Sequence, residues 1–271
     1  MTDKRPQLSP RSGAITMPVR WTAMLLALAL PVGYSHAEQV RFVTEDFPPF
    51  TFAATTAPID TPAGPFVDVI GAVCAQLRID CPIQLLPWRR ALALAEGGEV
   101  DGIFTVIRSP ERERAFHLTR MLVTSRYGVY ARSASRFVFH RPEDLAGRTV
   151  AVYGPSGTSF VLGQHLTKVA DVELILESDN RRLMRMLQAG RFGEQGVAVV
   201  NQDVAWHLIE QERLADIHEA GELQAVSYAI GLSRAAVSEA EFKRFNQALE
   251  SLIADGTVSR ILRRYGLQPA F

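Results

Sequence analysis

Apolar and polar positions follow two periods in turn along the first half of the chain. Short apolar, β-branched runs predict strands at Val40–Thr44, Ile83–Leu86 and Ile103–Ile107. Between them, apolar residues recur at helical spacing from Pro65 to Leu77, and a further helix is predicted to open at Pro87. This order of strands and helices predicts an α/β fold with a parallel sheet covered by helices.

The second half continues the alternation. We expect helices over Phe160–Lys168 and Asp179–Gln188, and a buried strand over Gly196–Val200. The run Tyr127–Ala131 is interpreted as a strand that leaves a first lobe, and Gln224–Ser233 as the strand that returns to it. The predicted division is therefore lobe 1 over residues 38–131 and 227–271, with lobe 2 over residues 132–226.

The first 37 residues have the pattern of a secretory signal. Arg20 precedes the apolar run Trp21–Val32, and Ser35-His36-Ala37 fits a small-x-small cleavage site. Both Met1 and Met17 are possible starts. We expect export to the periplasm and a mature chain that begins at Glu38.

Charge and cysteine content narrow the classes of partner. Residues 1–37 hold four bases and one acid, so the remaining chain has 25 bases and 28 acids, a net charge of about −3. Such a balance predicts neither nucleic-acid nor anionic-membrane binding. Cys74 and Cys81 both lie in the exported part, and the sequence does not decide between a disulfide and two free thiols.

The stretch Glu99–Arg112 carries the candidate chemistry. Its strand runs into Ser109-Pro110-Glu111, which is typical of a helix N-cap, first-turn proline and first-turn acid. A carboxylate placed there would meet the Ser109 hydroxyl and the guanidinium fork of Arg112. The same residues could equally form an ordinary helix opening with a solvated arginine.

This stretch resembles the signature of the periplasmic solute-binding proteins of amino-acid ABC importers. The resemblance implies the class II periplasmic binding-protein fold, with two lobes and two crossings between them. It implies that Ser109 and Arg112 hold a ligand carboxylate, and Thr105 on the preceding strand is expected beside them. It also implies that Phe47 and Trp88 line the cleft.

In lobe 2 the resemblance assigns the other side of the cleft. The turn Gly154–Ser159 brings Gly157 and Thr158 to the ligand carboxylate, although an ordinary strand-to-helix connection is the alternative. The family's ammonium-binding acid falls on Asn201 or Asp203, and Asp203 could instead be a helix N-cap. Arg108 stands where the family has a small residue, so it either adds a second guanidinium or points to solvent.

The sequence lacks the common motifs of other chemistries. Its six histidines form no metal-binding pair, and it has neither a phosphate-binding loop nor a Gly-x-Ser-x-Gly elbow. We expect a monomeric receptor, without metal or cofactor, that captures an amino acid or organic acid and delivers it to an inner-membrane ABC permease. Two alternatives stay open: a cyclohexadienyl-type dehydratase that uses Glu45 or Asp46, and a soluble sensor subunit of a membrane kinase.

Overall fold

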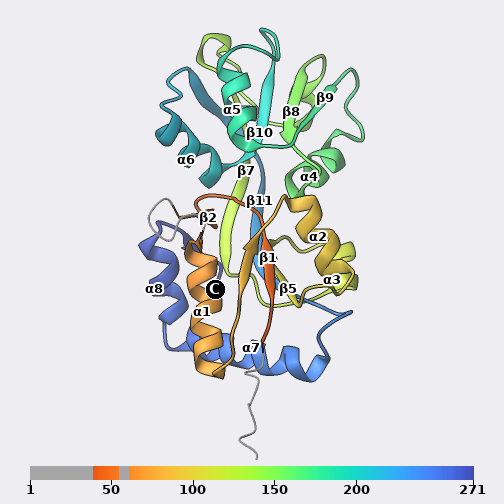
Figure 1. Cartoon of the computed structure of the whole chain (residues 1–271). Helices are drawn as coiled ribbons and strands as arrows, with labels where there is room; N and C mark the ends of the chain where they lie inside the picture. Colours follow the sequence, from red (N-terminus) through yellow and green to blue (C-terminus); the bar gives the residue numbers. More distant parts are fainter. Residues whose placement is uncertain (1–38, 55–60) are drawn as a thin grey trace, which may run out of the picture. The chain divides into compact units, whose positions relative to one another are not determined.

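A computed structural model describes residues 39–54 and 61–271 (Figure 1). The expected signal sequence and its cleavage site lie outside these residues. The described chain from Gln39 onward belongs to one compact unit. Within the described residues it contains eight α-helices and twelve strands. Ten of the strands form one sheet: eight follow the order β4-β1-β5-β11-β7-β10-β8-β9, β6 pairs with β11, and β12 pairs with β7.

Lobe 1 is built on three parallel strands. Strand β1 (Phe42–Thr44) pairs with β4 (Ile83–Leu85) on one side and β5 (Gly102–Val106) on the other. The helices α1 (Pro65–Leu77) and α2 (Trp88–Glu96) connect these strands. All five residues of β5 are buried, as its continuous apolar pattern predicts for an inner strand.

The C-terminal part of the chain completes lobe 1. Helices α7 (Glu239–Ala254) and α8 (Thr257–Arg264) pack on α1. Four short strands also belong here: β2 (Phe52–Ala53), β3 (Pro62–Ala63), β6 (Phe116–Leu118) and β12 (Gln268–Pro269). None of these four strands was predicted, because a segment of two or three residues is too short to show the alternation of apolar and polar positions that indicates a strand.

Lobe 2 has the same construction. Its parallel strands are β8 (Thr149–Tyr153), β9 (Glu173–Glu177) and β10 (Val197–Asn201). Three helices pack against them: α4 (Gly157–Leu166), α5 (Asn180–Gln188) and α6 (Gln202–Glu212). Helix α4 begins three residues before the predicted Phe160, because Ser156 caps it and forms a capping box with Ser159. In α5, the buried residues are Leu183, Met184 and Leu187.

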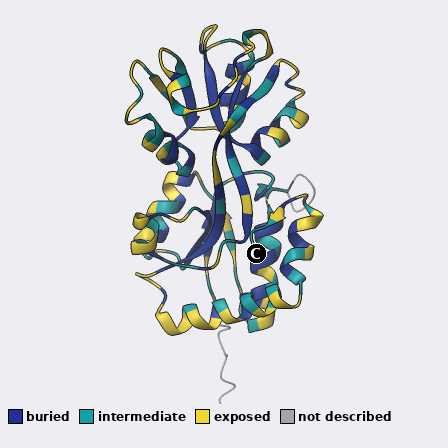
Figure 2. Cartoon of the chain, turned by 180° about the vertical axis from the view of Figure 1, so that it is seen from behind, coloured by how far each residue is buried: buried dark blue, intermediate teal, exposed yellow. Residues whose placement is uncertain are grey.

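Two long antiparallel strands connect the lobes. Strand β7 (Val123–Arg132) pairs with β11 (Ile217–Ser233) along almost its whole length. The last residues of β11 join β5 of lobe 1, whereas residues 127–131 of β7 join β10 of lobe 2. The predicted leaving and returning strands are therefore present, and β11 begins seven residues earlier than predicted. Figure 2 shows these strands mostly in the colour of buried residues.

Cys74 and Cys81 form a disulfide, which settles the alternative left open by the sequence. The bond joins the last turn of α1 to Cys81, two residues before β4, across a sequence separation of seven residues. Loop-closure entropy for so short a loop predicts a contribution of about 2.5 kcal/mol to the free energy of unfolding.

Replacing both cysteines by alanine is expected to lower the unfolding free energy by about 2.5 kcal/mol. Urea unfolding of residues 38–271, with and without a reductant, measures this change. The reductant should destabilise the native chain and leave the double variant unaffected. Equal unfolding midpoints for the native and variant proteins would contradict the prediction.

Candidate functional site

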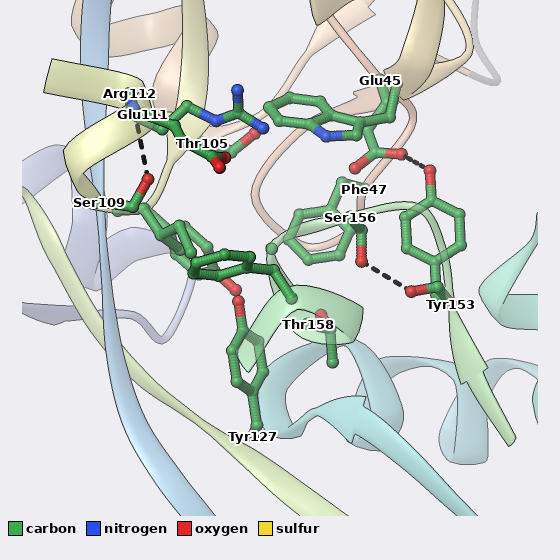
Figure 3. A pocket seen from close by; sticks show the side chains of 15 residues that line it. Glu45, Phe47, Thr105, Ser109, Glu111, Arg112, Tyr127, Tyr153, Ser156 and Thr158 are labelled. Carbon is green, nitrogen blue, oxygen red and sulfur yellow. Dashed lines mark hydrogen bonds between the residues drawn. The ribbon is translucent and has the colours of Figure 1, made fainter. Parts of the chain in front are cut away.

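A cavity with about 550 Å³ of empty space lies between the lobes. Residues of both lobes and of the two connecting strands line it. Figure 3 shows Arg112 and Ser109 on one side of this cavity and Tyr153 and Ser156 on the other. Seven of the nine residues expected at the ligand line it together: Phe47, Trp88, Thr105, Ser109, Arg112, Gly157 and Thr158.

Arg112 and Ser109 form the cationic corner of the cavity. Ser109 is the N-cap of α3 (Pro110–Ala115), and its hydroxyl oxygen accepts a hydrogen bond from the Arg112 backbone amide at 3.3 Å. The Arg112 side chain is only 16% exposed, and its Nη1 donates to Glu96 Oε1 at 2.6 Å. A guanidinium has five N–H donors, so this ion pair fixes the group and leaves donors for a ligand carboxylate.

Arg108 points away from this corner. Its side chain is 53% exposed and pairs with Glu113 on the surface of the same short helix. The sequence left open whether Arg108 adds a second guanidinium to the site or points to solvent, and the structure supports the second interpretation. Arg112 is the arginine that the structure places at the cavity.

Thr105 reaches the cavity through an irregularity in its strand. Along β11, Ala229 lies opposite Val106 and Ile230 lies opposite Phe104, which leaves Thr105 without a partner in this ladder. Its φ of +61° is a costly conformation for a β-branched residue. Its hydroxyl donates to the Phe104 carbonyl and lies 3.3 Å from the Thr44 hydroxyl. This bulge turns the residue toward the site.

Aromatic side chains form much of the remaining wall. Phe47 and Trp88 are each 6% exposed, and Phe47 stacks on Phe50 with ring centroids 5.3 Å apart. Tyr228 packs edge-on against Phe47, with centroids 6.0 Å apart. Tyr127, Tyr153 and Phe160 also line the cavity. The wall thus offers ring faces for apolar or cationic parts of a ligand.

Glu45 connects the two lobes at the cavity wall. It follows β1 in lobe 1 and accepts a hydrogen bond from the hydroxyl of Tyr153, the last residue of β8 in lobe 2. Burial raises the pKa of Glu45 to about 8, and the nearby Asp46 adds to this shift. Burial and Glu45 also raise the pKa of Tyr153, so that its hydroxyl keeps its proton. This hydrogen bond crosses the cleft, and its strength depends on whether the Glu45 carboxyl group is protonated.

The start of α4 approaches lobe 1 closely. A Cβ atom at Gly157 would lie 3.2 Å from Ile107 Cδ1 and 3.2 Å from the Tyr127 hydroxyl, a tighter contact than side chains normally make. The neighbouring Thr158 is buried and hydrogen-bonds with Tyr127. Glycine therefore allows the first amide groups of α4, which have no acceptor within the helix, to reach the cavity.

The structure puts Asn201 and Asp203 behind the cavity wall. Asn201 is the N-cap of α6, where its side chain accepts from the Val204 amide at 3.2 Å. Its amide also donates to Ser125 at 2.8 Å and to the Tyr228 hydroxyl at 2.9 Å. Asp203 accepts a 2.5 Å hydrogen bond from Ser125, and burial raises its pKa. The N-cap of α6 is thus Asn201 and not Asp203, which the sequence had offered as the alternative. Asn201 also holds the cavity residue Tyr228 in place.

Eight cavity residues were not among the expected ligand contacts. Glu45 entered the sequence interpretation only as a possible catalytic acid. The others are Ile107, Glu111, Tyr127, Tyr153, Ser156, Phe160 and Tyr228. Tyr153 directly precedes the glycine-rich turn and Ser156 lies within it, so the turn itself is a signal that could have identified both residues. Tyr127 and Tyr228 come from strands a hundred residues apart, and a single sequence carries no signal for their proximity.

The described residues carry neither a candidate metal site nor a membrane-spanning helix. Residues 39–54 and 61–271 contain no group of three or more potential metal-ligating side chains. Within the same residues, no helix is long and apolar enough to cross a membrane.

Solved structures with a similar fold are numerous. A histidine kinase sensor domain with similarity to periplasmic binding proteins has 22% identity and a TM-score of 0.75, and the match covers 86% of this chain and 98% of that one. The substrate-binding protein of an amino-acid ABC transporter has 19% identity and a TM-score of 0.69, covering 84% and 98%. A further transporter substrate-binding protein, from Streptococcus pneumoniae and bound to L-arginine, has 16% identity and a TM-score of 0.71, covering 84% and 94%.

The fold is that of the class II periplasmic binding proteins, as the resemblance in the sequence implied. The sequence profile of the bacterial extracellular solute-binding proteins, family 3, matches residues 40–268, and the chain belongs to this family. No curated protein matches the sequence.

Proposed function

We propose that this protein is a periplasmic receptor that captures a small carboxylate-bearing ligand, an amino acid or a related acid, and delivers it to an ABC permease. The observation that carries the proposal is the position of Arg112, whose guanidinium is largely buried at a cavity between two lobes. A buried cation with free N–H donors is the strongest recognition element for a carboxylate in this cavity.

The ligand docks first on lobe 1. Arg112 and Ser109 take its carboxylate, and Phe47 and Trp88 cover its remaining part. Closure then brings Gly157, Thr158 and Tyr153 of lobe 2 across the cavity. Because the ligand contacts both lobes, its binding energy favours the closed form, which is the form that a permease recognises.

A thermal-shift screen of residues 38–271 against amino acids, polyamines and small organic acids tests the proposal. Ligand at a hundred times its dissociation constant should stabilise the protein by about 2.7 kcal/mol. For a protein of this size, that corresponds to a rise of about 5 °C or more in the unfolding midpoint. A screen in which no carboxylate raises the midpoint would reject the receptor.

Glu45 supports a second candidate, a periplasmic dehydratase of the cyclohexadienyl type. A carboxyl group with a pKa of about 8 inside a cavity stays protonated at neutral pH and can act as a general acid. Incubation with prephenate or arogenate, followed by detection of the aromatic product, tests this activity. Product formation that Glu45→Gln abolishes would favour the enzyme over the receptor.

The histidine kinase sensor domain with the same fold supports a third candidate, a sensor subunit. This candidate shares the ligand site and differs only in the membrane partner. Crosslinking of the liganded protein to inner membranes should recover an ABC permease. Recovery of a kinase alone would identify the sensor.

A further inference from the structure

A groove continues from the cavity onto the surface. It has about 780 Å³ of empty space and lies between α2 of lobe 1 and the β9 edge of lobe 2. Trp88, Arg112, Ser156 and Phe160 line both the groove and the cavity. The groove therefore adjoins the cavity along these four side chains, and Arg112 borders both.

The far wall of the groove is apolar although it faces solvent. Phe160, Leu174 and Leu176 are 38%, 44% and 53% exposed, and all three line the groove. Only three other large apolar side chains are equally exposed in residues 39–54 and 61–271. Such a concentration is unusual for scattered surface residues and is typical of a binding site.

The alternation along β9 shows that this exposure is a property of one strand face. Glu173 and Glu177 lie on the opposite face, where Glu173 accepts from Thr149 and Glu177 pairs with Arg182. Leu174 and Leu176 thus lie together on the face that lines the groove. On the lobe 1 side, the half-buried Leu92 of α2 lines the same groove.

We infer that the ligand is a carboxylate with an extended apolar chain or ring, which lies in this groove over Phe160, Leu174 and Leu176. The inference rests on the proposed receptor function, because Arg112 must hold the carboxylate end. A small ligand is favoured over a docked protein because the groove adjoins the cavity and Arg112, the proposed carboxylate-binding residue, lines both. An apolar chain there contacts α2 and β9 together and so adds to lobe closure.

The test uses two series of probes with the mature chain: straight-chain 2-amino acids and straight-chain fatty acids, each from four to ten carbons. Isothermal titration gives the dissociation constant of each member. Each methylene that enters the groove should tighten binding by about fourfold, so that two such methylenes already make the eight-carbon member bind at least about tenfold more tightly than the four-carbon one.

A double variant, Leu174→Ser with Leu176→Ser, should remove this gain and leave the shortest members unchanged. Val138→Ser is the matched control, because Val138 is 56% exposed and lies outside the groove. Equal unfolding midpoints for the three proteins confirm that folding is intact.

Two results would overturn the inference while the receptor function stands: short members bind without any dependence on chain length, or the gain persists in the double variant. The second result would show that the apolar chain of the ligand lies elsewhere than over Leu174 and Leu176. Failure of every member to bind would overturn the inference, and the separate ligand screen would then decide the receptor function.

Discussion

Arg112→Gln is expected to weaken ligand binding by about a hundredfold or more. The variant removes the positive charge and the fork of N–H donors from a corner that is largely buried. Loss of one partner of a desolvated charge pair costs about 2–5 kcal/mol, which corresponds to a factor of about thirty to several thousand. Titration of the ligand found in the thermal-shift screen measures this factor.

Arg108→Gln is the matched control for this experiment. It removes the same charge four residues away, from a side chain that is exposed and paired with Glu113. Binding to this variant should stay within about twofold of the native value. Arg112→Lys should fall between, because lysine keeps the charge and loses the planar fork. Equal losses of affinity in the two glutamine variants would show that the overall positive charge of this region attracts the ligand, and not a specific contact with Arg112.

Glu45→Gln is expected to become more stable relative to the native protein as the pH rises from about 5 to about 8. Folding raises the pKa of Glu45 from its ordinary value of 4.5 to about 8. Between these values the folded protein holds a proton that the unfolded chain releases, so native stability falls as the pH rises. The slope is at most about 1.4 kcal/mol per pH unit. Glutamine keeps the shape, accepts from Tyr153 and does not titrate.

Urea unfolding at one-unit steps from pH 5 to pH 9 measures the difference between the two proteins. Glu111→Gln serves as the control, because Glu111 also lines the cavity but is exposed to solvent. The difference between Glu45→Gln and the native protein should grow through neutral pH and level off above about pH 8. A difference that is constant with pH would show that Glu45 is already ionised in the folded protein.

The parts of the fold and site that the sequence predicted depend on local chemistry. Ser109 caps α3, and Asp179 caps α5, because a short polar side chain before a helical run satisfies its first amide groups wherever the run lies. The strand into Ser109 is buried because its apolar residues are continuous. Arg112 follows from these two facts, since the cap fixes its place on the first turn.

The parts that the sequence did not predict depend on contacts between distant segments. Thr105 was expected at the site, but the bulge that turns it toward the cavity was not, because this bulge depends on pairing with β11, more than a hundred residues further along. Asn201 was weighed as a ligand contact, yet its position beside Ser125 and Tyr228 makes it a support for the cavity wall. Tyr127 and Tyr228 lie together at the site because β7 pairs with β11. The residue pattern of each strand does not determine this pairing.

The ladder between β7 and β11 shifts register twice, between Glu219 and Gly221 and between Glu222 and Gln224. Both shifts lie opposite residues 127–130 of β7, just where that strand begins to pair with β10. A ribbon with two extra residues bends and twists most easily at that point. In the receptor that we propose, the lobes would open about these two bulges, so the hinge depends on the main chain and ligand selectivity on the side chains of the cavity. Substitutions in the cavity of such a receptor would change the ligand and leave the hinge unchanged.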